Sequence, residues 1–132
     1  MDGAQIKLRV ARATERMAQV TAFYVDGLGF ERLAAFADHE GFDGVILGFP
    51  GAPYHLEFTH QRDGNGSATP HPETLLVFYL PDAADWRAAV ARLRTLGAEP
   101  VASLNPYWDR SGLTFEDPDG FRIVLQQDVW RL

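Results

Sequence analysis

Along the first half of the chain, the spacing of apolar residues changes once, from that of a strand to that of a helix. Three short apolar segments follow. In Gln5–Ala11, apolar residues alternate with polar ones, which is the period of a half-buried strand. Helical spacing of apolar residues comes next, with Thr14 in the N-cap position and Gly27 and Gly29 at the end. Glycine and proline then separate three apolar runs, which predict strands at Phe30–Ala37, Gly44–Phe49 and Tyr54–His60.

The second half repeats this order after a polar segment. Gln61–Glu73 is rich in glycine, proline and small residues and lacks a hydrophobic period, so it is predicted to be a linker. Thr74–Leu80 is predicted to be a strand, and Pro81-Asp82 is expected to open a helix that Gly97 caps. The remaining apolar runs predict short strands at Pro100–Ala102, Leu113–Glu116 and Phe121–Gln127.

Landmarks of the two halves match at a nearly constant offset of 66 to 68 residues. The matched positions are Arg9 with Leu75, Leu28-Gly29 with Leu96-Gly97, and Glu57 with Val124. An internal duplication explains this most economically, and an unrelated α+β domain with coincidental spacing is the alternative. The chain is therefore predicted to be one domain over residues 1–132, with βαβββ modules at about 5–60 and 74–127 and a linker at 61–73.

Three motifs in this order resemble the vicinal oxygen chelate superfamily, which includes glyoxalase I, bleomycin-resistance proteins, fosfomycin-resistance enzymes and extradiol dioxygenases. They are FYVDGLGFE at Phe23–Glu31, YHLEFT at Tyr54–Thr59 and FEDPDGFRIVLQ at Phe115–Gln126. The resemblance implies an α+β fold in which two βαβββ modules form curled mixed sheets around a cleft. It also implies a homodimer, because small single-domain members usually pair.

Composition narrows the possible partners and chemistry. The 132 residues carry 18 acidic and 12 basic side chains, so the net charge of −6 argues against nucleic acid or an anionic membrane as the main partner. The absence of cysteine excludes disulfides, thiolate metal sites and cysteine nucleophiles. The apolar runs are far shorter than the roughly 20 residues of a membrane span. No signal peptide is evident at the start, and a cytoplasmic protein is expected.

The resemblance also implies four metal-ligand positions, which fall on Arg9, Glu57, Leu75 and Val124. Only Glu57 offers a ligand, because a guanidinium has no free lone pair and Leu and Val have no donor atom. No metal cofactor is therefore expected. A non-standard site remains the alternative, with His55 and Glu57 on the same face of one strand and further ligands from a dimer partner.

Strand alternation identifies the side chains that share a face with these positions. Arg9 and Glu57 are the candidate catalytic residues: Arg9 either binds an anionic substrate group, with Glu57 or His55 as acid or base, or Arg9 and Glu57 simply neutralise each other. Tyr107 and Trp108, beside Asn105-Pro106, either form a lid or wall that stacks on a flat ligand, or belong to a loop that anchors on the core or closes the dimer. The candidate ligand-binding residues are His55, Tyr79, Arg122, Gln126, Tyr107 and Trp108.

These residues predict a metal-free protein that binds a small amphipathic or aromatic molecule in its cleft. The bleomycin-resistance proteins, which sequester their ligands, show that the superfamily supports such a role. The alternative is a glyoxalase-type lyase or isomerase that uses Glu57 with a non-standard metal site or with Arg9 as the electrophile. An accessory protein whose dimer surface matters is a third possibility. Extradiol dioxygenase activity is not expected, because its two His and one Glu ligands are missing.

Overall fold

A computed structural model describes residues 6–64 and 68–130 of the chain. Gln5 of the first predicted strand and residues 65–67 of the predicted linker lie outside the described residues. The chain divides into two compact units, the first made of residues 1–25 and 29–68 and the second of residues 26–28 and 69–132. No helix in the described part of the chain is long and apolar enough to cross a membrane.

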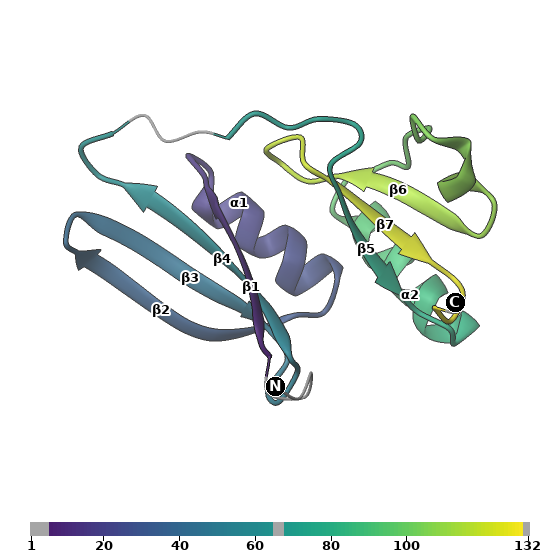
Figure 1. Ribbon diagram of the computed structural model, residues 1–132, viewed down its shortest axis with the longest axis horizontal. Coiled ribbons are helices and arrows are strands. Elements are labelled where there is room, and N and C mark those ends of the chain that lie inside the picture. Colours follow the sequence, from purple (N-terminus) through teal and green to yellow (C-terminus); the bar gives the residue numbers. More distant parts are fainter. Residues whose placement is uncertain (1–5, 65–67, 131–132) are drawn as a thin grey trace. The chain divides into compact units, whose positions relative to one another are not determined.

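The first unit is a four-stranded mixed sheet with a helical segment against one face (Figure 1). Its strand order is β1-β4-β3-β2, with β1 parallel to β4 and the other pairs antiparallel. This arrangement confirms the βαβββ pattern predicted for the first module. The elements are β1 (Leu8–Ala13), α1 (Met17–Ala22), β2 (Glu31–His39), β3 (Phe42–Gly48) and β4 (Tyr54–Gln61). The π-helix η2 (Phe23–Gly27) follows α1, and its last two residues belong to the second unit.

The core of the first unit lies between the helical segment and the even-numbered face of β4. Leu56 and Phe58 are buried, and the ring of Phe58 stacks on that of Tyr24 at 5.2 Å. Arg12 donates from Nη2 to the Tyr24 hydroxyl at 2.8 Å, which satisfies a polar group at the edge of this core. The opposite face of β4 is thereby left for the odd-numbered side chains.

The second unit repeats the sheet with one strand fewer. Its order is β5-β7-β6, with β5 parallel to β7 and β6 antiparallel to β7. The α2 helix begins as predicted, because the Asp82 side chain accepts from the Asp85 backbone N–H, and Gly97 lies just past its end at φ +90°. The elements are β5 (Leu75–Tyr79), α2 (Ala83–Thr95), the 3₁₀-helix η3 (Pro106–Asp109), β6 (Gly112–Glu116) and β7 (Arg122–Gln126).

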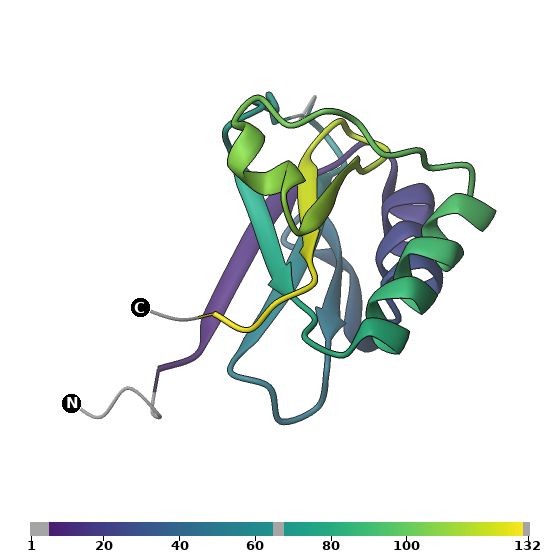
Figure 2. The ribbon, with the colours of Figure 1, turned by 90° about the vertical axis from the view of Figure 1, so that its right-hand side faces the viewer.

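The predicted strand at Pro100–Ala102 is wrong: only Val101 forms an isolated bridge, to Thr114. A few residues later Asn105 accepts from the Tyr107 N–H, and Pro106 begins η3 at a position where a helix needs no donor. The chain therefore leaves the edge of β6. Figure 2 shows that η3 lies on the opposite face of this sheet from α2.

Two details of the first helix also differ from the prediction. Thr14 is not its N-cap: the helix begins at Met17, and the Thr14 hydroxyl accepts from the Arg16 N–H at 2.9 Å in a local turn. Gly29 does adopt a positive φ, of 84°, but Gly27 does not. A Cβ at Gly27 would lie 2.5 Å from Leu93 Cδ2, so this glycine is needed for close packing within the second unit.

Candidate functional site

Three predicted site residues come together on one face of the first sheet. The parallel register pairs Arg9 of β1 with His55 of β4 and places Glu57 two residues further along the same strand. Side chains two positions apart in a strand point to the same side, so all three lie on the face opposite α1. Glu57 is also the register partner of Ile46 in β3.

The Arg9 guanidinium bridges the other two side chains. Its Nε donates to His55 Nε2 at 2.8 Å, and its Nη1 lies 3.4 Å from Glu57 Oε2. A guanidinium has no acceptor, so His55 Nε2 is the acceptor in this bond. The Glu57 side chain is only 15% exposed and the Arg9 side chain 47% exposed. The donors of Arg9 therefore remain reachable from solvent, whereas the carboxylate is largely covered.

His55 and Glu57 by themselves are too few ligands to hold a metal ion. His55 and Glu57 supply two possible ligands, and the positive guanidinium bonded to both would repel a second cation. No group of three or more His, Asp or Glu side chains with the spacing to hold a metal ion occurs within residues 6–64 and 68–130. The cluster suits recognition of a carboxylate or carbonyl oxygen by Arg9, or proton transfer at Glu57.

The corresponding face of the second sheet has a different chemistry. The register pairs Leu75 with Arg122, Val77 with Val124 and Tyr79 with Gln126. Val124, at the position that matches Glu57, is fully buried and has no donor atom. Arg122 is occupied, because its Nε donates to Glu116 at 3.2 Å and its Nη1 to the Ala102 carbonyl at 3.3 Å. Arg122 of β7 therefore holds the backbone at Ala102 against its own sheet in this structure.

Gln126 is the least satisfied polar side chain on that face. The residue is 5% exposed, and its Oε1 is buried without a hydrogen-bond partner in the described part of the chain. Its register partner on β6 is Gly112, where an added Cβ would overlap Gln126 Oε1. The amide is therefore packed tightly against the backbone of β6, and nothing places it in a ligand-binding role.

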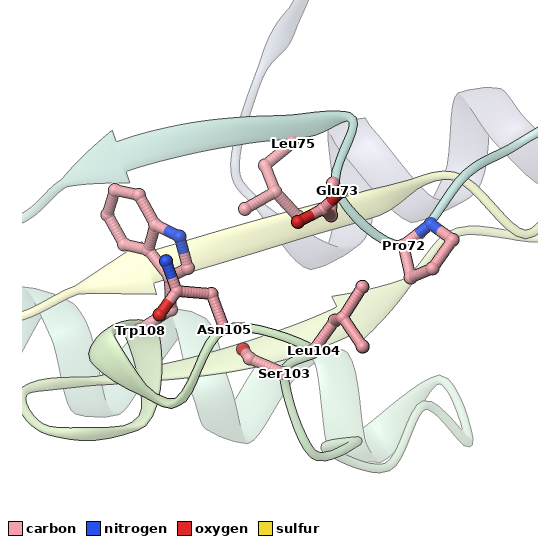
Figure 3. Close-up of a pocket in the computed structure, with 7 residues that line it drawn as sticks. All are labelled: Pro72, Glu73, Leu75, Ser103, Leu104, Asn105 and Trp108. Carbon is pink, nitrogen blue, oxygen red and sulfur yellow. The ribbon is translucent and has the colours of Figure 1, made fainter.

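The segment that carries η3 forms a small cavity of about 100 Å³ with the beginning of β5. Trp108 lines this cavity, whereas Tyr107 does not: the Tyr107 side chain is exposed, edge-on to Trp108 at 5.0 Å and under the Arg110 guanidinium at 5.7 Å. Figure 3 shows the lining side chains around one open space. They are Pro72, Glu73, Leu75, Ser103, Leu104, Asn105 and Trp108.

Sequence reasoning missed most of this lining. Glu73 falls at the end of the predicted linker, where polar composition gave no indication of a site. Ser103 and Leu104 lie just after the wrongly predicted strand. The one available signal was Asn105-Pro106, the pair that begins η3 and turns the segment over the sheet.

Comparison with known proteins matches both halves of the chain. The family model described as the YycE-like N-terminal domain matches residues 8–59, and that of the YycE-like C-terminal domain matches residues 73–127. The uncharacterized protein YycE of Bacillus subtilis (strain 168) is 46% identical over 119 residues, which cover 90% of this chain and 86% of the relative. Its crystal structure superposes with a TM-score of 0.88 at 43% identity, over 95% of this chain and 91% of that one.

More distant structures share the fold alone. The trypanothione-dependent glyoxalase I of Leishmania major has a TM-score of 0.72 at 18% identity, over 94% of this chain and 87% of that chain. TnmS3, an antibiotic binding protein from Streptomyces sp. CB03234, has a TM-score of 0.64 at 24% identity, over 96% of this chain and 97% of that one. The same architecture thus occurs in a glyoxalase I and in an antibiotic binding protein.

Proposed function

We propose that this chain, which belongs to the YycE-like family of the vicinal oxygen chelate superfamily, binds a small amphipathic or aromatic molecule without a metal ion. The observation that supports this proposal is the placement of Arg9, bonded to His55 and Glu57 on one strand face. At a position where the superfamily resemblance implies a metal ligand, this chain has the permanently charged Arg9 guanidinium, which has more hydrogen-bond donors than its bonds to His55 and Glu57 use.

The surroundings of the cluster favour a ligand with one polar and one apolar end. Across the same face, Ile46 stands beside Glu57, and Phe36 lies over Gly44. Both apolar side chains are half-buried, so they retain surface for a ligand. A carboxylate or carbonyl oxygen would bind the Arg9 guanidinium while an apolar or aromatic body covers Ile46 and Phe36.

Metal analysis and calorimetry test this proposal together. Protein purified without chelators is expected to contain far less than one equivalent of Zn, Ni, Mn, Fe or Mg. An aromatic carboxylate such as 4-phenylbutyrate should raise the unfolding temperature in proportion to the logarithm of its concentration above Kd. Arg9→Ala should abolish this shift.

A matched arginine on the second unit provides the control. Arg87 is exposed on α2, and Arg87→Ala removes the same charge away from the cluster. This variant should keep the full response to 4-phenylbutyrate. One equivalent of metal in the purified protein, or an unchanged response in Arg9→Ala, would overturn the proposal.

A second candidate function, a glyoxalase-type lyase or isomerase, draws support from the covered Glu57 carboxylate. Glu57 would remove a proton α to a carbonyl whose oxygen Arg9 polarises, or would serve in a non-standard metal site. The test is solvent deuterium exchange at that carbon in a dicarbonyl–thiol adduct, monitored by NMR. Exchange that Glu57→Gln abolishes would favour the enzyme, and binding without exchange would favour the binding protein.

We also propose that the chain is a homodimer in solution. Several large apolar side chains are exposed, among them Leu8, Leu104 and Trp130, which is 64% exposed. Sedimentation at micromolar concentration should show a dimer, and a monomer at every concentration would contradict the proposal.

A further inference from the structure

We propose that the cavity under the η3 segment is a second binding site, which takes a small organic cation such as an alkylammonium group. The cavity lies between the start of β5 and the 103–108 segment, and it shares no residue with the Arg9 cluster. Figure 3 shows the Glu73 carboxylate and the Trp108 ring facing the same space from two sides, with Leu75 between them.

The charge of the lining selects a cation. Glu73 is the only ionised side chain that lines the cavity, and no Lys or Arg lines it. No side chain in the described part of the chain forms an ion pair or hydrogen bond with the Glu73 carboxylate; the backbone N–H of Glu73 donates to His71 Nδ1 at 3.1 Å. A carboxylate with an unused charge attracts a cation and repels a second anion.

The other walls determine which kind of cation fits. Pro72, Leu75 and Leu104 are apolar, so a part of the ligand that carries carbon atoms would cover them. A divalent metal ion would need several oxygen or nitrogen ligands, and this cavity offers a single carboxylate. A volume of about 100 Å³ holds a head group with a short carbon chain.

The wall that carries Trp108 is held in place before any ligand arrives. Ser103 and Thr114 share a hydroxyl hydrogen bond at 2.5 Å, and the Trp108 backbone N–H donates to the Asn105 carbonyl at 3.2 Å. The Asn105 side chain accepts from the Tyr107 N–H at 3.0 Å. Binding therefore requires little reordering of this segment, which reduces the entropic cost of association.

The experiment is a titration of the full chain with three probes of equal length, monitored through the indole N–H signal of Trp108 in ¹⁵N–¹H spectra. Trp108→Phe identifies that signal among the three tryptophans. Butylammonium should shift it saturably, whereas butyrate should leave it unmoved and butanol should bind more weakly than butylammonium.

Two variants separate charge from shape. Glu73→Gln keeps the size of the side chain and should weaken butylammonium binding roughly tenfold, while butanol binding is retained. Glu40→Gln removes an equal charge at an exposed position in the first unit and should change nothing.

The outcomes distinguish this site from the Arg9 cluster. Arg9→Ala should leave butylammonium binding unchanged, because Arg9 does not line the cavity. Butyrate that binds as well as butylammonium, an affinity unaffected by Glu73→Gln, or no response to butylammonium in the unmodified protein would each overturn the proposal.

Discussion

The two halves of the molecule place their first and last strands side by side in the same way, but the corresponding faces of β4 and β7 have opposite chemistry. In the first unit β4 carries Glu57, bonded to Arg9, whereas in the second unit the matching position of β7 is the fully buried Val124. Both strands pair in parallel with the first strand of their own unit. Because strands pair through backbone groups, the side chains on the matching faces of β4 and β7 can differ while the strand pairing stays the same.

The two units also differ in the segment that comes after the helix. In the first unit, nine residues form the full edge strand β2. In the second unit, only Val101 bridges to β6, and the chain then crosses the sheet face as η3. One copy therefore presents a polar cluster directly on its strands, whereas the other builds a cavity from a segment laid over them. A duplicated fold has produced two different kinds of candidate site.

Exchanging the side chains at the matched positions Glu57 and Val124 should have the largest effect on the free energy of unfolding. Val124→Glu places an unpaired carboxylate in a fully buried position and should cost more than about 3 kcal/mol of unfolding free energy. The reciprocal change, Glu57→Val, removes a partly exposed ion pair and should cost about 1 kcal/mol or less. Urea unfolding monitored by circular dichroism measures both.

Val124→Ile serves as the control, because it changes the size of the side chain without adding charge. Equal costs for Val124→Glu and Glu57→Val would contradict the difference between the two faces. Equal costs would mean that the face of β7 is as accessible to water as that of β4.

Replacing a glycine on each face by alanine should give a smaller difference in the free energy of unfolding. An added methyl at Gly112 meets the Leu125 and Trp108 backbone carbonyls as well as Gln126, so Gly112→Ala should cost about 1–3 kcal/mol. At Gly44 the methyl meets only the far end of the half-buried Phe36 ring, which can swing outward. Gly44→Ala should therefore cost less than Gly112→Ala in the same unfolding assay, and the reverse order would contradict this packing.

The smallest effect on stability should come from the ion pair between Asp43 and Arg62 in the first unit. Asp43 accepts from Arg62 Nη2 at 2.7 Å and from the Asp38 backbone N–H at 3.0 Å, and these bonds hold the pKa of Asp43 below its ordinary value. A lowered folded-state pKa stabilises the fold above the unfolded value of about 3.9, and this stabilisation is lost as pH falls through the folded-state pKa.

Asp43→Asn should accordingly lower the midpoint of urea unfolding slightly at pH 7. The difference from the unmodified protein should shrink in 1 M salt and disappear in acid, because salt screens the pair and acid removes the charge in both states. A difference that persists unchanged in acid would show that the effect does not arise from the Asp43 charge.

Much of the fold is readable from the sequence because it depends on local periodicity. Alternating apolar residues located β4 and β7, and Asp82 and Gly97 marked the ends of α2 through capping chemistry. The strand face shared by Arg9, His55 and Glu57 could be inferred from alternation once the two strands were aligned.

The missing parts depend on contacts between segments that are distant in sequence. The apolar Val101 resembled the middle of a strand, but Asn105 and Pro106 begin a 3₁₀ turn that ends the pairing. Glu73 lines the cavity only because η3 folds back over β5, which no local pattern encodes. The bond from Arg9 to His55 likewise depends on rotamers, which alternation does not determine.

The strand order has a consequence for how the chain assembles. In each unit the last strand to be synthesised, β4 or β7, occupies an inner position and pairs with the first strand on one side and with its hairpin partner on the other. Until that strand emerges from the ribosome, β1 and β5 have no neighbour within their own sheets. Each half is thus completed by inserting its final strand into the middle, so that folding of each half waits for its last few residues.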